Sequence, residues 1–394
     1  MHKKIVSAIG VCMLSLGLYA QETEMSNVLH EIAENNKKLQ AYSLLIESRH
    51  LDMKTENNLP DPQTDVYYLP WGNNSGGNYT EVQVSQSLEF PTVYGARDKL
   101  FDQQREKMQV EYQALRQEIL LEAKKHLLEI IFLNKKLAVE EKRAQNARQV
   151  YDQIQELYEN EEVGRLELNK AKVAWMQEQF RIQQIESQKR NELVILKELN
   201  GGNEVAFNAS DYDRSLAVEP LDSLWKNKLL EDPNLAVLNH QEEVARQQVK
   251  LSKNQALPDL MAGFNYQEAP NSSFSGLYAG ISIPLWNSRN KVKASNAKVQ
   301  YQESYSKAQT MKAFARLQNQ YNEYHRLLSK FNGYQSTLED LQSEALLLEA
   351  YRLGEISFIE YFMELQFYRQ AFDSMLQVEN RLNKLKAEII KHQL

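Results

Sequence analysis

A long internal repeat constrains the architecture of this chain more than any single residue does. The tripeptide Leu59-Pro60-Asp61 returns as Leu257-Pro258-Asp259. Three pairs of positions follow in the same order at similar separations: Pro60 with Pro258, Arg97 with Arg289, and Gly164 with Gly354. Each copy predicts a helix, a strand, a loop, a strand, a very long helix, a turn and a helix. The repeat therefore predicts a first structural unit at 21–205 and a second at 206–394.

The first twenty residues have the layout of a secretory signal peptide. Lys3 and Lys4 precede an apolar run, and Ala20 ends the segment at a suitable cleavage position. The alternative, a transmembrane anchor, is disfavoured because the apolar run is short. The only cysteine, Cys12, would leave with this segment, so the exported chain would have no disulfide, cysteine nucleophile or thiolate metal site.

Composition argues against two classes of function. The net charge is −7, and Lys and Arg do not cluster as they do in proteins that bind nucleic acid. The seven histidines are scattered, and neither a phosphate-binding glycine loop nor a serine elbow is present in the sequence. We therefore expect no enzyme activity, no cofactor, no metal site and no nucleic-acid partner.

Two very long helices dominate the predicted secondary structure. Residues 97–160 contain neither proline nor glycine, and apolar residues recur at alternating steps of three and four, as in a coiled coil. Such a helix would span about 95 Å. The second copy repeats this stripe with one interruption at Gly333. Shorter helices are expected at 23–49, 166–200, 222–255 and 357–393, stacked in pairs beside each long one. A simple helical bundle is the alternative if helices alone are considered.

Four short segments alternate between apolar and polar residues, as strands with two different faces do. They lie at 65–71, 82–90, 260–266 and 279–285, and predict hairpins at about 64–90 and 259–285 with loops at 72–78 and 268–275. One face of such a strand can contact lipid and the other a lumen. Four strands cannot close a barrel, since outer-membrane barrels have about eight or more. Several chains would have to share one barrel; a soluble sheet capping a bundle is the alternative.

Several motifs together resemble the TolC-like outer-membrane efflux protein family, in a form similar to the branch that serves heavy-metal and other cation exporters. They are the two Leu-Pro-Asp tripeptides, the strand ends Ser87 to Arg97 and Ser282 to Arg289, and the turn Tyr351 to Ser357. The resemblance implies a mainly α fold with a small β part: a duplicated helix, β-hairpin and long helical hairpin. Three chains would form a twelve-stranded β-barrel and a twelve-helix periplasmic tunnel.

The resemblance also implies a function. Such homotrimers are passive exit ducts of tripartite efflux systems in the outer membrane of Gram-negative bacteria, in contact with its lipid. A periplasmic adaptor joins the duct to an inner-membrane pump, often of the resistance-nodulation-division class. Two alternatives stay open: a periplasmic coiled-coil scaffold or adaptor protein, and the exit duct of a type I protein secretion system.

Three groups of residues are candidates for function. The helix turns are expected to dock the adaptor through Val163, Gly164, Arg165, Leu353, Gly354 and Glu355. By resemblance, Glu360 and Glu364 are candidates for a pore constriction, although both could be ordinary exposed glutamates on a helix. Arg97 and Arg289 follow the strands, where they could contact lipid phosphates or hold a carboxylate at the barrel-to-tunnel junction.

Overall fold

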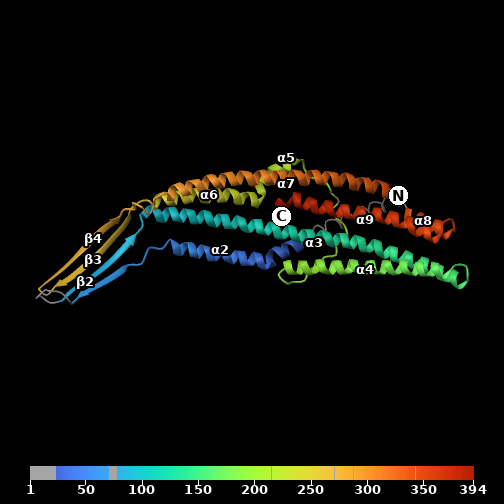
Figure 1. The fold of residues 1–394 in the computed structure, drawn as a ribbon, viewed down its shortest axis with the longest axis horizontal. Coiled ribbons are helices and arrows are strands. Elements are labelled where there is room, and N and C mark those ends of the chain that lie inside the picture. The colour runs from blue at the N-terminus through green and yellow to red at the C-terminus, as the bar shows by residue number, and fades with distance from the viewer. Residues whose placement is uncertain (1–23, 71–77, 214, 270, 287, 342) are drawn as a thin grey trace, which may run out of the picture. The chain divides into compact units, whose positions relative to one another are not determined.

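The computed structural model describes residues 24–70, 78–213, 215–269, 271–286, 288–341 and 343–394. The predicted signal peptide at 1–20 and nearly all of the predicted loop at 72–78 lie outside these residues. The chain is mainly helical, with one small sheet (Figure 1). Its helices are residues 24–35, α2 (Lys37–Glu56), α3 (Pro91–Glu159), α4 (Arg165–Leu199), α5 (Leu221–Glu231), α6 (Pro233–Asn254), α7 (Lys291–Leu341), α8 (Ser343–Arg352), α9 (Phe358–Ile389) and the short 3₁₀ helix η1 (Lys391–Gln393).

Two compact units make up the chain. The helical unit contains the segments up to residue 40, 115–232 and 314–394, and the sheet unit contains 41–114 and 233–313. Each unit therefore takes segments from both predicted repeats, and α3 and α7 contribute to both. The division of the chain into repeats at residue 205 stays a prediction.

The sheet is antiparallel, with its strands in the order β1 (Gln63–Leu69), β2 (Tyr79–Leu88), β3 (Asp259–Ala269) and β4 (Ser272–Ser282). Two hairpins, one from each half of the chain, meet where β2 pairs with β3. Val84 lies opposite Phe264, and Phe264 lies opposite Leu277, so residues of like polarity face the same side.

Several predicted element boundaries were wrong, each for a local reason. The predicted loop at 268–275 is mostly paired strand, because Glu268 lies opposite Ser273 and Ala269 opposite Ser272. Strand β4 ends at Ser282, before Pro284, which has no N–H to donate to a neighbouring strand.

The remaining errors concern helices and the chain next to them. The predicted helix at 222–255 is two helices, because Pro233 begins a new one, as proline does at a first helical position. The predicted helix at 23–49 is interrupted at Asn36, whose side-chain oxygen accepts hydrogen bonds from the backbone N–H groups of Lys38 and Leu39. Strand β2 ends at Leu88 rather than residue 90, and Phe90 instead packs in a small core with Val93.

The core of the helical unit is a set of helix–helix seams. The buried residues of α3 include Leu127, Ile130 and Ile131, spaced as one face of a helix requires. Near the turns, Val150 and Ile154 of α3 pack with residues of α4 and α9. The coiled-coil stripe expected from the sequence is confirmed in part: its residues Ile130, Leu133, Ala144 and Ile154 are buried, whereas Tyr158 at its end is 37% exposed.

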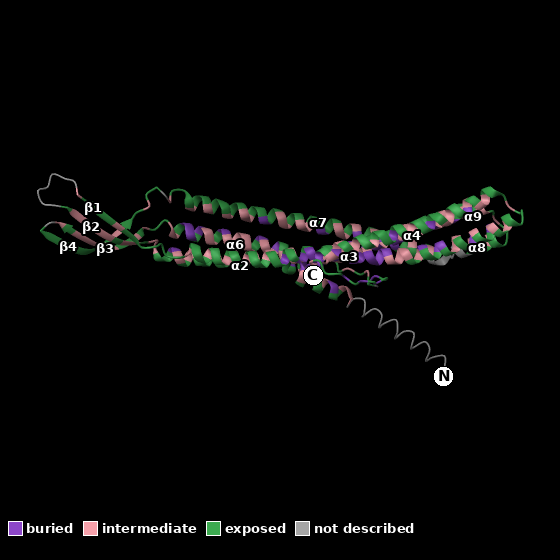
Figure 2. Ribbon diagram, turned by 90° about the horizontal axis from the view of Figure 1, so that it is seen from below, coloured by how far each residue is buried: buried purple, intermediate pink, exposed green. Residues whose placement is uncertain are grey.

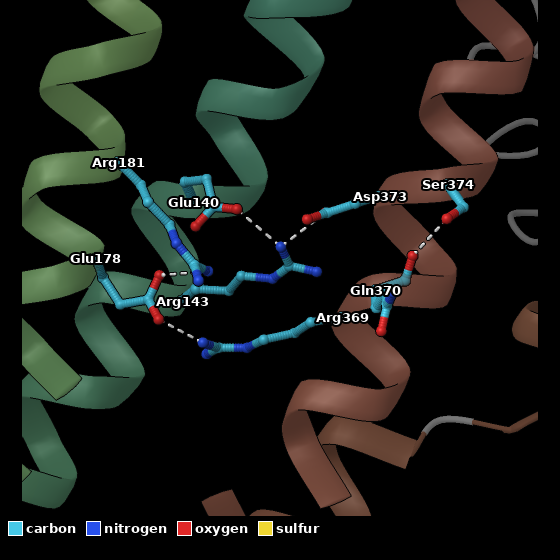
Figure 3. A network of polar contacts seen from close by, with 8 residues as sticks. All are labelled: Glu140, Arg143, Glu178, Arg181, Arg369, Gln370, Asp373 and Ser374. Atoms are coloured by element: carbon cyan, nitrogen blue, oxygen red, sulfur yellow. Dashed lines mark hydrogen bonds and ion pairs between the residues drawn. The ribbon is translucent and has the colours of Figure 1, made fainter. Parts of the chain in front are cut away.

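Charged residues are also buried between these helices (Figure 3). Glu178 of α4 is 2% exposed and accepts a hydrogen bond from Arg369 Nη1 of α9 at 2.5 Å. Arg143 of α3 is 1% exposed and donates to Glu140 at 2.8 Å and to Asp373 of α9 at 2.9 Å. Two buried ion-pair groups thus tie α9 to α3 and to α4.

Breaking one of these pairs should destabilise the fold strongly. We expect Arg369→Met to lower the free energy of unfolding by about 3–5 kcal/mol, because it leaves the buried Glu178 carboxylate without its main partner. Arg181 also approaches Glu178, at 3.5 Å, but its side chain is 39% exposed. Arg181→Met, the matched control, should cost less than about 1 kcal/mol.

Denaturant unfolding of the purified full chain measures both variants. The double variant Glu178→Met/Arg369→Met should recover most of the lost stability, because no unpaired charge is left buried. Equal costs for Arg369→Met and Arg181→Met would contradict the role given to burial.

Candidate functional site

One face of the sheet is mainly apolar, and the other is mainly polar although it also carries Leu69, Met261 and Phe274. The pairing places these side chains together on the apolar face: Val66, Tyr68, Val82, Val84, Leu88, Leu260, Ala262, Phe264, Tyr266, Leu277, Ala279 and Ile281. Many of them are open to solvent in the isolated chain: Leu277 is 88% exposed, and Val66 and Ile281 are each 66% exposed. Figure 2 shows the strands in the colours of exposed and intermediate residues. Large exposed apolar patches mark surfaces that contact a partner or a membrane.

The polar face carries a network centred on Glu81 of β2. Its carboxylate accepts hydrogen bonds from the Tyr79 hydroxyl at 2.8 Å, Gln83 Nε2 at 2.6 Å and Asn265 Nδ2 of β3 at 2.9 Å. The last of these bonds links the two hairpins. This face therefore suits contact with water, whereas the opposite face does not.

The two candidate arginines after the strands have different surroundings. Arg97 has a side chain that is 13% exposed and forms an ion pair with Glu89 at 2.6 Å. Its guanidinium also lies 5.7 Å from the ring centre of Tyr94. Arg97 therefore holds a carboxylate within the chain, and its role at a barrel-to-tunnel junction stays a prediction. Arg289 lies in the turn before α7 and is exposed.

The two helix turns share one backbone design. At the end of α8, the Gly354 N–H donates to the Tyr351 carbonyl at 3.1 Å and the Glu355 N–H donates to the Ala350 carbonyl at 2.9 Å. Gly354 has φ = 74°, the left-handed conformation that completes this type of helix end. The end of α3 repeats the pattern with Glu161 at φ = 62°.

This geometry corrects the alignment of the two copies. The counterpart of Gly354 is Glu161, not Gly164, because Gly164 stands three residues later, at the residue before α4. The counterpart of Gly164 is Ser357, the residue before α9. The alignment by sequence matched two glycines that have different backbone roles.

The predicted docking residues lie in these turns but are not equivalent to one another. Leu353 is 68% exposed, and Arg165 and Glu355 are also exposed. Val163 instead packs partly against the core between the two turns. The exposed part of the predicted docking surface is therefore smaller than the set of six residues.

Glu360 is an exposed residue that caps the start of α9. The Ser357 hydroxyl accepts a hydrogen bond from the Glu360 N–H at 3.3 Å, and the Glu360 carboxylate accepts one from the Ser357 N–H at 2.8 Å. This reciprocal pair is a capping box. The hydrogen bond from the Ser357 backbone lowers the pKa of Glu360. The capping contribution is therefore complete above the ordinary glutamate pKa and is lost as the pH falls through the lowered value.

Sequence reasoning missed the partner of Glu360 and the buried charges. Ser357 and Glu360 have the Ser-x-x-Glu spacing of a capping box, so the sequence contained the signal. Glu364, the other predicted constriction residue, is exposed one turn further along α9. Among the described residues, no three His, Cys, Asp or Glu side chains are grouped as a metal site would need.

Comparison with known proteins gives the fold. Neither a protein-family model nor a curated protein matches the chain. Solved structures do match, among them CusC, described in connection with transmembrane channel formation, which is 14% identical with a TM-score of 0.74 and covers 92% of this chain and 90% of its own. The outer-membrane channel CmeC of Campylobacter jejuni is 14% identical with a TM-score of 0.72, covering 94% and 85%. The outer-membrane protein VceC of Vibrio cholerae is 12% identical with a TM-score of 0.74, covering 95% and 97%.

The chain therefore has the fold of these outer-membrane proteins over nearly its whole length. The resemblance to TolC-like proteins expected from the sequence is confirmed at the level of the fold. In the part of the chain that the structure describes, no helix is long and apolar enough to cross a membrane.

The capping box should stabilise the turn between α8 and α9. Ser357→Ala removes the hydroxyl that accepts the Glu360 N–H and should weaken the first turn of α9 by about 1 kcal/mol. Hydrogen exchange of the backbone amides at 358–361 measures this change. Ser374→Ala is the control, because that hydroxyl only donates to the Gln370 carbonyl inside α9. An equal loss of protection in both variants would contradict a specific capping role.

Proposed function

We propose that the chain is an exit duct in the outer membrane of a Gram-negative bacterium. The observation that carries this proposal is the sheet, whose apolar face is uncovered in the chain while its opposite face is polar. Lipid supplies an apolar solvent for the first face, and an aqueous lumen supplies water for the second. The fold shared with outer-membrane channels supports the same assignment.

Three copies complete the duct in this proposal. In the described part of the chain the edge strands β1 and β4 each have only one neighbouring strand, and such a sheet cannot rest in lipid, because unpaired backbone groups are costly there. Three chains provide twelve strands, enough to close a cylinder. The long helices α3 and α7, with their shorter neighbours, would then form the wall of a periplasmic tunnel.

The helix turns would lie at the periplasmic end and dock an adaptor. Leu353, Gly354 and Glu355 of one turn and Arg165 beside the other offer exposed groups for this contact. The pump that supplies energy would belong to the inner membrane, with the resistance-nodulation-division class as the first candidate. Substrates would pass through the duct without any chemical step.

Glu360 would line the tunnel entrance. Its side chain is exposed in the first turn of α9, and three copies around a narrow axis would form a ring that attracts cations. The capping box does not exclude this role, because one carboxylate oxygen accepts the Ser357 N–H and the other stays available.

Two other functions fit parts of the molecule. A periplasmic scaffold or adaptor would use the long helices, but it gives no reason for a sheet with an uncovered apolar face. The exit duct of a type I secretion system would have the same sheet and the same turns. The duct proposal therefore covers both an efflux system and a type I secretion system. Transport assays with small molecules and with proteins as cargo decide between them.

Reconstitution tests the duct directly. The full chain should fractionate with the outer membrane, migrate as a trimer in unheated electrophoresis and conduct ions in planar bilayers. Glu360→Gln should lower the preference for cations over anions, because it removes one charge per copy from the entrance. Glu186→Gln is the control, because Glu186 is an exposed glutamate of α4. A soluble monomer would refute the duct, and an unchanged ion preference would refute only the role of Glu360.

A charge at the second turn should block docking. Gly354→Asp should still form trimers, because Asp is one of the side chains that tolerate a left-handed backbone. Efflux should be lost, since the new carboxylate stands beside Glu355 on the proposed docking surface. Sensitivity of the native host to a panel of dyes, antibiotics and metal salts measures efflux. Gly354→Asn is the uncharged control, and normal efflux by the Asp variant would remove the docking proposal.

A further inference from the structure

Helix α4 has apolar side chains on two opposite faces. Ala171 and Ile185 are buried within the chain. Val173, Met176 and Phe180 are 50%, 42% and 59% exposed, and we name these three residues the outer ridge. At 3.6 residues per turn the outer ridge lies on the side of α4 away from Ala171. Nothing in the described part of the chain covers it to the extent expected for large apolar side chains.

A groove of about 400 Å³ lies between α7 and α9. Its lining includes Gly333, Tyr334 and Thr337 of α7 and Phe367, Tyr368 and Ala371 of α9. We name it the Gly333 groove. Phe367 is 68% exposed. It lies two residues from both Leu365 and Arg369, the α9 residues that face α4, so it points to the opposite side of α9.

Contacts within the described part of the chain do not explain why residue 333 is a glycine. A Cβ atom built on it would meet nothing within 4 Å, so no close neighbour in the chain requires glycine there. A glycine inside a helix costs about 1 kcal/mol relative to alanine. The open space at Gly333 leaves room beside α7 for a side chain from outside the chain.

The outer ridge and the Gly333 groove lie at the same height along the helices. Glu178 of α4 contacts Arg369 of α9, and this contact fixes the level. Met176 and Phe180 stand on either side of Glu178 in sequence, as Phe367 and Ala371 stand on either side of Arg369. Rotation about an axis parallel to the helices keeps every residue at its height, so the ridge of one copy would meet the groove of the next.

One pair of charges beside the two surfaces is complementary, at the end of the groove away from its own Lys330. Lys172 is exposed beside the outer ridge, and Glu364 is exposed beside the groove. Lys172 is next to Ala171 in sequence and Glu364 is next to Leu365, and Ala171 and Leu365 belong to one core cluster. The two charged residues therefore lie at a similar height along the helices. An approaching α4 would therefore bring a positive charge to a negative one. In such an arrangement Glu364 belongs to the contact between copies, and Glu360 alone belongs to the entrance.

We propose that the outer ridge of α4 packs into the Gly333 groove of a second copy of this chain. The two surfaces differ and lie on opposite sides of the helical unit's α4–α9 contact, so the contact is head-to-tail and forms a ring when the rotation between copies closes, as in the proposed trimer. The outer ridge supplies the knobs, and the absent side chain of Gly333 leaves the hole for them. The inference rests on the proposed trimeric duct and identifies the seam that would hold it together.

Cross-linking tests the seam without interference from other thiols, because the only cysteine, Cys12, lies in the predicted signal peptide. Met176→Cys combined with Thr337→Cys should give covalent dimers and trimers when membranes are treated with a short bis-maleimide. Each single variant should give monomers. Val194→Cys combined with Thr337→Cys is the matched control, because Val194 is 64% exposed on the same helix but lies at another height.

A second variant fills the groove. Gly333→Leu should fold, because its Cβ meets nothing and leucine favours helix, yet the oligomer in unheated electrophoresis should be lost. If the Met176→Cys/Thr337→Cys variant forms trimers in unheated electrophoresis but gives no covalent dimers or trimers with the bis-maleimide, the proposed seam is wrong. Trimers that persist in Gly333→Leu would also overturn the seam. Both outcomes would leave the duct proposal standing. Intact trimers that lose efflux in Gly333→Leu would also overturn the seam, by assigning the groove to another partner. A soluble monomer of the unmodified chain would instead refute the duct itself.

Discussion

The pairing between β2 and β3 is the constraint on which the rest of the molecule depends. It joins hairpins from the two halves of the chain and brings Val82, Val84 and Leu88 onto the same face as Leu260 and Phe264. A shift of one residue would move the side chains on the apolar face of one hairpin to the mainly polar face. The register thus decides that the sheet has one mainly apolar face and one mainly polar face, which is what the proposed duct requires.

In the helical unit, the constraint is on the position of each long helix along the axis of its neighbours. Apolar seams between helices tolerate sliding, since one leucine resembles the next. Buried ion pairs do not, because a displaced Arg369 or Glu178 would be a buried charge without a partner. We infer that these pairs fix the height of α9 against α4. The outer ridge and the Gly333 groove depend on that height.

The strands could be predicted from the sequence because a two-residue period of polarity is typical of a strand with two different faces. Their ends were misplaced, since Phe90 and Pro284 are apolar like the strand but serve other roles. Glu178 and Arg369 were missed because buried charges on a helix look like a solvated face. The turns were misaligned because glycine was taken as the marker of the left-handed position, which Glu161 occupies in the first turn. Secondary structure could therefore be predicted from local sequence patterns, whereas contacts between segments far apart in the sequence could not.

The two turns consequently differ in how their shape is maintained. The second has glycine at the left-handed position and a capping box at the start of the next helix. The first has Glu161 at the left-handed position, which is unfavourable for a residue with a side chain, and Gly164 before α4 offers no side-chain cap. The first turn therefore holds the same geometry at a higher conformational cost. In a ring of three copies, turns of two kinds would alternate around the axis. The end of such a ring would have threefold rather than sixfold symmetry, both in the sequence of its turns and in their stability.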